Sequence, residues 1–309
     1  MPQTRKKSVL HKMLVQRELF FMIIPVVIYV FVFHYLPLSG WQMAFQNFKP
    51  NPNMTKQEWV DPLTKHFDTL FKSDFFLPIM RNTLAMSTIN LVLGFSCAIA
   101  FALLLNEIRI SGVKRVVQTV SYMPHFLSWV IACSMINDFL SSRGTLNTLL
   151  MNFNLVSEPI IFLAEPNRFW AIIGISNVWK SMGWNSIIYL AAISAIDPEL
   201  YESADIDGAG RFSKMWHITL PSIKSTILVL LIMNIGWILN AGFEPQFLLG
   251  NALTWDVAET IDVYVIRHGI GRRNFSLGTA VGMFKTLVSI ILIYSANYLS
   301  RTFTKESLV

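Results

Sequence analysis

The chain contains 309 residues, of which 53% are hydrophobic and 14% are charged, and its mean hydropathy is +0.47. Because soluble domains carry about 25% charged residues, this balance excludes an ordinary soluble domain and indicates a polytopic membrane protein. The formal net charge of +6 is explained by basic residues beside the expected membrane spans and requires no nucleic acid partner.

Six apolar stretches are long enough to cross a hydrocarbon core of about 30 Å as helices. In chain order they are 20–38, 83–105, 119–140, 169–193, 222–240 and 277–299. The sequence therefore predicts an all-α fold with six transmembrane helices. The first stretch follows a basic segment, as in a signal peptide. No small-residue cleavage site follows it, so we expect it to be retained as a span.

Basic residues near the ends of the spans predict the orientation of the chain. The amino-terminal segment contains Arg5, Lys6, Lys7, Lys12 and Arg17. Since cytoplasmic segments are enriched in Lys and Arg, we expect the amino terminus in the cytoplasm. With six spans, the carboxyl terminus and the loop at 194–221 are then also cytoplasmic. The loops expected outside are 39–82, 141–168 and 241–276.

The loop at 194–221 is polar, unlike the apolar spans on both sides, and it contains several glycines and prolines. Asp197 is a suitable N-cap for a helix that begins at Pro198 and ends near Ile206. The run Asp207-Gly208-Ala209-Gly210 then tolerates positive φ and reverses the chain. A second short helix is expected at 211–216. Leu220-Pro221 is expected to end the loop, because a residue before proline resists the helical conformation.

Leu200, Tyr201 and Ala204 share one face of the first predicted helix. This face is small and apolar and is flanked by acidic side chains, among them Glu202. Such a face is typical of a helix that docks into a groove on another protein. An ordinary amphipathic connector is the alternative interpretation.

The same residues resemble the EAA loop of importer-type ABC transporter permeases, whose pattern is roughly E-A-A-x-x-D-G-A, a spacer, then I-x-L-P. Here the pattern reads Glu202-Ser203-Ala204, Asp207-Gly208-Ala209 and Ile218-Thr219-Leu220-Pro221. Ser203 stands where alanine is usual, but serine is also small. The resemblance implies cytoplasmic coupling helices that sit in a cleft of an ATP-binding subunit. It assigns ATPase coupling to Tyr201, Glu202, Ser203, Ala204, Asp207, Gly208, Ala209, Leu220 and Pro221.

Two further stretches, 20–48 and 121–130, resemble permeases for oligo- or polysaccharide uptake, especially in Gram-positive bacteria. The resemblance implies a multi-pass protein of the bacterial cell membrane, in contact with lipid, that forms half of a heterodimeric pore. Its partners would be a homologous permease, two ATP-binding subunits and an extracytoplasmic sugar-binding protein. The chain itself would be non-catalytic and need no cofactor, with ATP and Mg bound by the ATPase. The expected divisions are a cytoplasmic segment at 1–19, one permease domain at 20–305 and a tail at 306–309.

Several motifs of other transporters and enzymes are missing from the sequence. No G-x-x-x-x-G-K-[ST] phosphate loop occurs, so the energy for transport must come from another subunit. Within the six predicted spans the one acidic residue is Asp138, at the outer end of the third, which argues against a proton-coupled carrier. No metal site is predicted, and Cys97 and Cys133 are expected to pack as small apolar residues. A permease for a non-sugar solute and a membrane-embedded enzyme or scaffold are the alternatives.

The fourth and fifth predicted spans contain amides and tryptophans that suit a sugar path. Amides offer hydrogen-bond donors and acceptors to hydroxyl groups, and an indole offers an apolar ring face and one N–H donor. Interhelical hydrogen bonds and packing are the alternative role of these side chains. The candidate path residues, with one lysine from the sixth span, are Asn177, Trp179, Lys180, Trp184, Asn185, Asn234, Trp237, Asn240 and Lys285.

Lys180 and Lys285 are the clearly intramembrane cations of the sequence. A charge near the centre of a bilayer is costly, so it is expected to face a polar interior. Each lysine is predicted either to contact an acidic group of the substrate, to form hydrogen bonds between helices, or to pair with a counter-ion in the partner permease.

Overall fold

A computed structural model describes residues 16–50 and 57–304, and these residues form helices with one isolated β-bridge between Gln46 and Trp59. The labels η denote short 3₁₀ or π-helical segments. The first elements are α2 (Arg17–Val30), η1 (Phe31–Tyr35), η2 (Leu36–Phe45), α3 (Lys65–Phe71), α4 (Phe76–Ile89), η3 (Asn90–Gly94) and α5 (Phe95–Asn106). The basic residues Arg5, Lys6, Lys7 and Lys12 and the tail at 306–309 lie outside the described residues.

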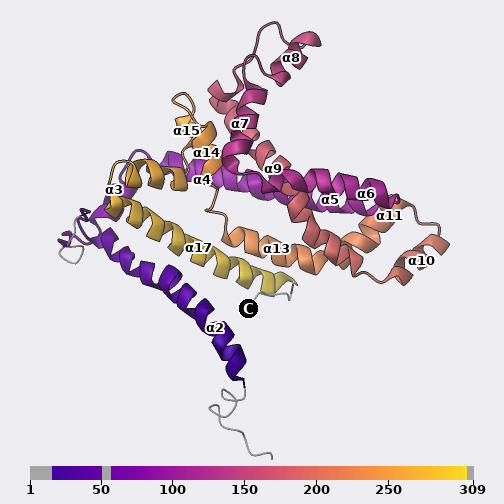
Figure 1. Cartoon of the computed structure of the whole chain (residues 1–309), viewed down its shortest axis with the longest axis horizontal. Coiled ribbons are helices and arrows are strands. Elements are labelled where there is room, and N and C mark those ends of the chain that lie inside the picture. Colours follow the sequence, from indigo (N-terminus) through magenta and orange to yellow (C-terminus); the bar gives the residue numbers. More distant parts are fainter. Residues whose placement is uncertain (1–15, 51–56, 305–309) are drawn as a thin grey trace, which may run out of the picture.

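The remaining elements follow in two groups. The first comprises α6 (Ser111–Tyr122), η4 (Met123–Phe126), α7 (Trp129–Leu140), α8 (Thr145–Asn152), η5 (Phe162–Ala164) and α9 (Pro166–Ser194). The second comprises α10 (Pro198–Ile206), α11 (Arg211–Lys214), η6 (Met215–Thr219), α12 (Leu220–Ser222), α13 (Lys224–Gly236), α14 (Glu244–Leu249), α15 (Trp255–Ala258), α16 (Ile261–Tyr264), η7 (Val265–Ile270) and α17 (Phe275–Thr304). Figure 1 shows α10 and α11 at one end of the molecule and α3 at the other, with long helices between them.

Among the described residues, three helices are long and apolar enough to cross a membrane: Arg17–Phe45, Phe76–Asn106 and Phe275–Tyr298. They contain the first, second and sixth predicted spans, apart from the last residue of the sixth. Two further apolar helix pairs are bent, and counting each pair as one span gives up to five. The chain is therefore an all-helical, multi-pass protein, and the predicted number of six is not reached by this criterion.

The third predicted span, 119–140, is wrong as a continuous helix. Ser111–Phe126 and Trp129–Asn152 meet at 105°, because Leu127 and Ser128 are extended and Ser128 caps a new helix by accepting the N–H of Ile131 at 3.3 Å. The fifth, 222–240, is shorter than predicted, since α13 ends at Gly236.

The fourth predicted span is a continuous helix, α9, which is long enough to cross a membrane but less apolar than the three helices above. Its sequence includes serines, asparagines, glycines and a lysine, which lower its hydropathy. These residues are tolerated because α9 packs against α4, α5, α6 and α13 and so meets protein on much of its surface. A helix surrounded by other helices does not need the all-apolar surface of a helix in lipid.

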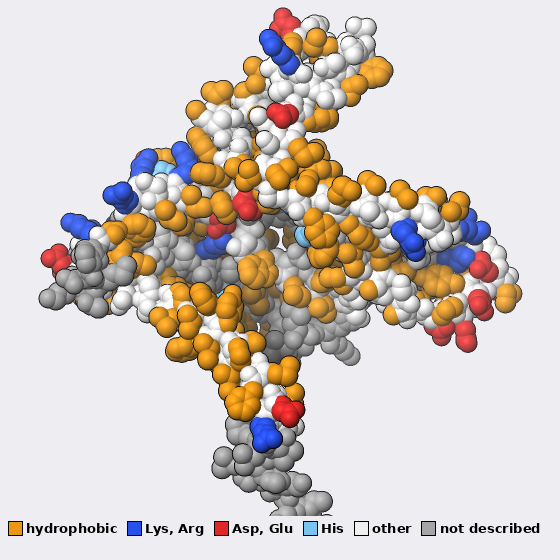
Figure 2. Space-filling model, in the orientation of Figure 1, with side chains coloured by type: hydrophobic (Ala, Val, Ile, Leu, Met, Phe, Trp, Pro, Cys, Tyr) orange, Lys and Arg blue, Asp and Glu red, His pale blue; other side chains and the backbone are white. Residues whose placement is uncertain are grey.

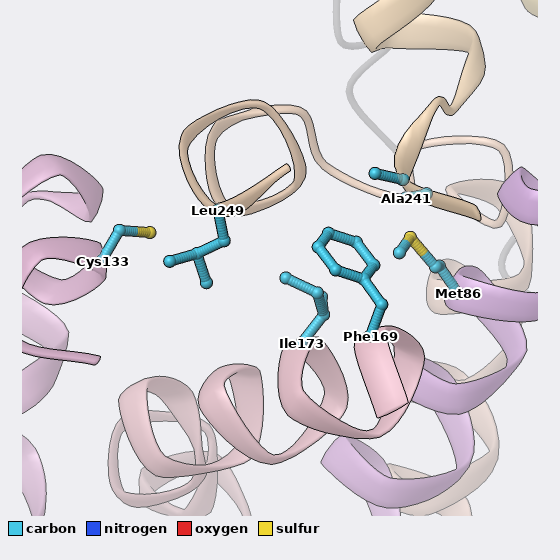
Figure 3. Packing of buried hydrophobic residues seen from close by; sticks show 7 residues of the cluster. Met86, Cys133, Phe169, Ile173, Ala241 and Leu249 are labelled. Atoms are coloured by element: carbon cyan, nitrogen blue, oxygen red, sulfur yellow. The ribbon is translucent and has the colours of Figure 1, made fainter. Parts of the chain in front are cut away.

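One buried cluster joins segments far apart in the sequence. Figure 3 shows Phe169 and Ile173 of α9 directed toward Ala241 and Leu249, with Met86 of α4 beside them. Cys133 of α7 belongs to the same cluster and is buried, which confirms its predicted role as a small apolar residue. This cluster fixes α9 against the chain segment that follows α13.

The α7–α8 arm, defined as 129–152, projects away from the other helices (Figure 1). Its turn is held by Asn147, whose side-chain amide donates to the carbonyls of Ser141 at 2.9 Å and Ile160 at 2.8 Å and accepts the N–H of Ile160 at 2.8 Å. Asn147 is completely buried, so these backbone groups have no water to replace it.

We expect Asn147→Ala to lower the free energy of local unfolding of the α7–α8 arm by about 2–4 kcal/mol, because it leaves buried backbone groups unpaired. Amide hydrogen exchange of 141–165 measures this energy. Asn152→Ala on the same helix is the control, since Asn152 is exposed. Equal exchange in the two variants would contradict the assignment.

Candidate functional site

The helix α10 begins and ends at the predicted residues, Pro198 and Ile206. The Asp197 carboxylate accepts the backbone N–H of Glu199 at 3.0 Å, which confirms Asp197 as the N-cap. Only the stretch from Ala195 to Asp197 separates α10 from α9. The short helix α10 is thus joined almost directly to α9, which packs inside the helical bundle.

Gly208 terminates α10 in a left-handed conformation, with φ of +76°. The N–H of Ala209 donates to the carbonyl of Ala204 at 2.9 Å, and the N–H of Gly208 donates to that of Asp205 at 3.1 Å. These two bonds form the helix-ending motif that requires positive φ after the last turn. The predicted reversal at Gly208 is therefore confirmed.

The second helical segment runs further than predicted. It comprises α11, η6 and α12, and it bends by 61° into α13 at Ile223. Leu220 is helical although it precedes Pro221, so the predicted loop end at Leu220-Pro221 is two residues early. The π-helical turn η6 lies just before this proline. It changes the hydrogen-bond spacing where a proline would otherwise remove a regular helical bond.

Two side-chain contacts hold α10 against the second segment. The hydroxyl of Tyr201 lies 2.9 Å from Oγ1 of Thr219, and the ammonium of Lys214 lies 2.6 Å from the carboxylate of Asp205. Tyr201 and Ala204 are half-buried, whereas Glu202 and Ser203 are exposed. Tyr201 thus stabilises the pair of segments from within instead of lying on the predicted outer face.

Three large apolar side chains of this loop are exposed and were not identified from the sequence. Ile206 is 88% exposed and Phe212 is 81% exposed, and Trp216 is also largely uncovered. Figure 2 shows acidic side chains gathered at the same end of the molecule, over α10. The sequence did carry a signal for this surface, because bulky apolar residues stand in an otherwise polar loop. An exposed apolar patch with a charged rim is typical of a protein-binding surface.

We expect Gly208→Val to leave membrane insertion intact and to abolish coupled transport, because a branched residue at φ of +76° is strained by about 1–2 kcal/mol or more. Uptake by the assembled transporter measures the effect. Gly210→Val is the control: neither glycine has a neighbour within 4 Å of an added Cβ, but Gly210 has φ of −69°. Normal uptake by Gly208→Val would refute the role of this turn.

A half-buried amide pair joins α9 to the helix Phe76–Asn106. The amide of Asn177 donates to Oδ1 of Asn90 at 2.9 Å, and Asn90 lies 3.4 Å from the carbonyl of Ala241, which also accepts from Gln246 at 2.7 Å. Asn90 begins the π-helical segment η3. Sequence reasoning missed Asn90, although an amide within an apolar span was visible.

The other polar candidates, on α9, on α13 and in the turn that follows α13, lie open to the surroundings of this chain. The ring of Trp184 stacks on that of His125 with centroids 4.5 Å apart and remains 42% exposed. The side chains that share this exposure are Asn185, Asn234, Trp237 and Asn240. Asn234 also donates to the carbonyl of Leu230 at 2.7 Å within its own helix.

Trp179 lies in a different place from the other candidates. With Met135, Phe139 and Ile175 it lines a cavity of about 980 Å³ between α7, α8 and α9. The predicted set of path residues is therefore divided, with Trp179 facing the α7–α8 arm.

The two intramembrane lysines both have partners in this chain. Lys180 donates to three backbone carbonyls, of Pro124 at 3.4 Å, His125 at 2.9 Å and Leu127 at 2.7 Å. This is the predicted alternative of a hydrogen bond between helices. Lys285 lies 2.5 Å from the carboxylate of Asp262, so its counter-ion belongs to this chain and not to a partner.

Residues 90–305 match the family described as "Binding-protein-dependent transport system inner membrane component", and the chain belongs to this family. It is 44% identical over 305 residues to the polygalacturonan/rhamnogalacturonan transport system permease protein YteP of Bacillus subtilis (strain 168), a match that covers 98% of this chain and 94% of the relative. It is 43% identical over 291 residues to protein LplB of the same organism, covering 94% and 90%.

A solved structure with the same fold belongs to a bacterial ABC transporter involved in the import of the acidic polysaccharide alginate. Its TM-score is 0.87 at 39% identity, with 96% of this chain and 99% of the other covered. The chain is thus a non-catalytic, membrane-embedded permease subunit of a binding-protein-dependent ABC importer, as the sequence predicted.

Proposed function

We propose that this permease translocates an acidic oligosaccharide, delivered by an extracytoplasmic binding protein and driven by partner ATPase subunits that bind ATP and Mg. The observation that carries this proposal is the similarity, near 40% identity over almost the whole chain, to permeases named for polygalacturonan and for alginate. Both polymers consist largely of sugar acids. Permeases named for arabinooligosaccharides are more distant, at 27% identity.

The charges of the chain support an acidic substrate. Two carboxylates with little solvent exposure, Glu259 and Asp262, are each neutralised by a cation: Arg267 lies 2.7 Å from Glu259 and Lys285 pairs with Asp262. The exposed candidate path residues contribute only amides and indoles, because Lys180 is bound to backbone carbonyls and Lys285 is paired with Asp262. A sugar carboxylate therefore meets no repelling free carboxylate among them.

The path in this proposal is lined by the exposed amides and rings of α9 and α13. Amides exchange hydrogen bonds with hydroxyl groups, and the ring faces of Trp184 and Trp237 cover the apolar faces of sugar rings. The Asn177–Asn90 pair lies deeper and joins the helices behind this surface.

The mechanism is alternating access. ATP closes the ATPase subunits, and the coupling unit, defined as 198–222, moves with them because α10 and α11 are held together by Tyr201 and Lys214. Glu202, exposed on α10, faces the ATPase cleft. The short connection to α9 carries this motion toward the path.

Topology and partners complete the proposal. Six spans result when each bent helix pair counts as one span and α9 is added to the three long helices. The amino terminus and the coupling unit then lie in the cytoplasm. A homologous second permease covers the exposed surface of α9 and α13, and one permease domain spans 20–305.

The proposal is tested by purifying the tagged chain from its native membrane and identifying accompanying proteins by mass spectrometry. A second permease, an ATPase and a binding protein are expected. The complex is then reconstituted, and uptake of oligogalacturonides is compared with uptake of neutral malto-oligosaccharides. Preference for the neutral sugar, or uptake of a non-sugar solute instead, would contradict the acidic substrate. Recovery of the chain alone would contradict the assembly.

We expect Trp184→Ala and Trp237→Ala each to reduce oligosaccharide uptake about 5-fold through loss of a ring face, without loss of assembly. Proteoliposome uptake at subsaturating sugar measures the change. Trp179→Ala is the matched control, because Trp179 is on the same helix as Trp184 and is 39% exposed but lines the separate cavity. An equal loss in all three variants would argue against a path at Trp184.

A further inference from the structure

The bend between η4 and α7 is the sharper of the two bends between apolar helix pairs, 105° against 61°. A helix that ends within a membrane leaves carbonyl oxygens without partners inside the helix. Lipid does not satisfy them, and where protein covers them water does not either, so protein groups must. Ser128 caps the start of α7, but it does nothing for the carbonyls of the turn that precedes it.

Lys180 of α9 donates to this turn, in which the carbonyl of Pro124 also accepts the N–H of Leu127 at 3.2 Å. An ammonium group has three N–H donors, and here they meet the carbonyls of Pro124, His125 and Leu127 at 2.7–3.4 Å. Lys180 is 7% exposed, and its ammonium also lies 5.3 Å from the ring centroid of Trp129. The lysine therefore works as a cap supplied by one helix to the broken end of another.

Two more contacts fasten the same stretch of α9 to this corner. Gly183 packs directly on the backbone carbonyl of Ser121, with no room for a side chain. One residue further on, Trp184 stacks parallel to His125, whose carbonyl is one of those bound by Lys180. Within about one helical turn, α9 thus contacts the corner through a charge, a backbone and a ring.

The helix that carries Lys180 is also the helix that leads into the coupling unit. Resting on the proposed function, we infer that Lys180 is a positioning residue that makes the η4–α7 corner and the α7–α8 arm move together with α9 when ATP binds. Its ammonium links the movement of α10 to the η4–α7 corner. His125 of the corner stacks on Trp184 of α9, so the same link fixes the part of the path surface that these two rings form.

The inference is tested in the reconstituted complex with spin labels on α8 and at the start of α13, introduced as Met151→Cys and Lys224→Cys in a Cys97→Ala, Cys133→Ala background. Both labelled positions are exposed. Double electron–electron resonance measures the distance between the two spin labels, first without nucleotide and then with ATP and vanadate. The same samples are assayed for ATP hydrolysis stimulated by the binding protein.

We expect ATP to shift the distance in the complex that retains Lys180. Lys180→Met should reduce this shift by more than half while stimulated hydrolysis stays within 2-fold, and Lys180→Arg should restore the shift. If Lys180→Met does not assemble, Lys180→Gln, which keeps two N–H donors, is scored by the same two readouts. No shift with Lys180 present, an unchanged shift without it, or a parallel loss of shift and hydrolysis would overturn the inference. Failure of the proposed function can be distinguished from failure of this inference, because it appears as missing oligogalacturonide uptake in the complex that retains Lys180.

Discussion

Interrupted helices in a membrane must satisfy their free backbone groups within the protein, and this constraint organises the structure. Two of the interruptions in the described chain lie at the η4–α7 corner and after Gly236. At the first interruption a lysine from another helix supplies the donors. At the second, the carbonyl of Ala241 accepts from Gln246 and lies within reach of Asn90. Each break is therefore also a joint between helices.

These joints explain why α9 is more polar than an ordinary span. Asn177 and Lys180 both reach out of α9 to groups on other helices. Their polarity serves contacts within the protein, while the neighbouring Trp184 and Asn185 remain open. A single helix thereby holds the bundle together and offers an exposed polar surface about one to two turns further along.

Local features of the chain were predictable from the sequence. The ends of α10 followed from Asp197, Pro198 and the glycine turn, because capping and positive φ depend on a few adjacent residues. The family resemblance depended on the same short segment. The first, second and sixth spans were found because apolar length is a property of the sequence alone.

Features that depend on tertiary contacts were not predictable. The break at Leu127 lies inside an apolar run, and it is stable because Lys180, more than fifty residues away in the sequence, caps it. The role of Asn90 in joining two helices is visible only when the fold places Asn177 beside it. The division between Trp179 and Trp184 required the actual rotation of α9, since residues five apart on a helix face different neighbours.

The exposure of α2 has a consequence for biosynthesis. The most apolar part of the span Arg17–Phe45 has none of its residues buried against the rest of the described chain. A helix in this position gains little from the later helices, so it can enter the membrane before they are made. The coupling unit is in the opposite situation: Ile206 and Phe212 are exposed in this chain, and in the proposed assembly they are covered only when a partner subunit binds. In the proposed orientation, this end of an unassembled subunit lies in the cytoplasm with its apolar side chains uncovered, where proteases and chaperones can reach it.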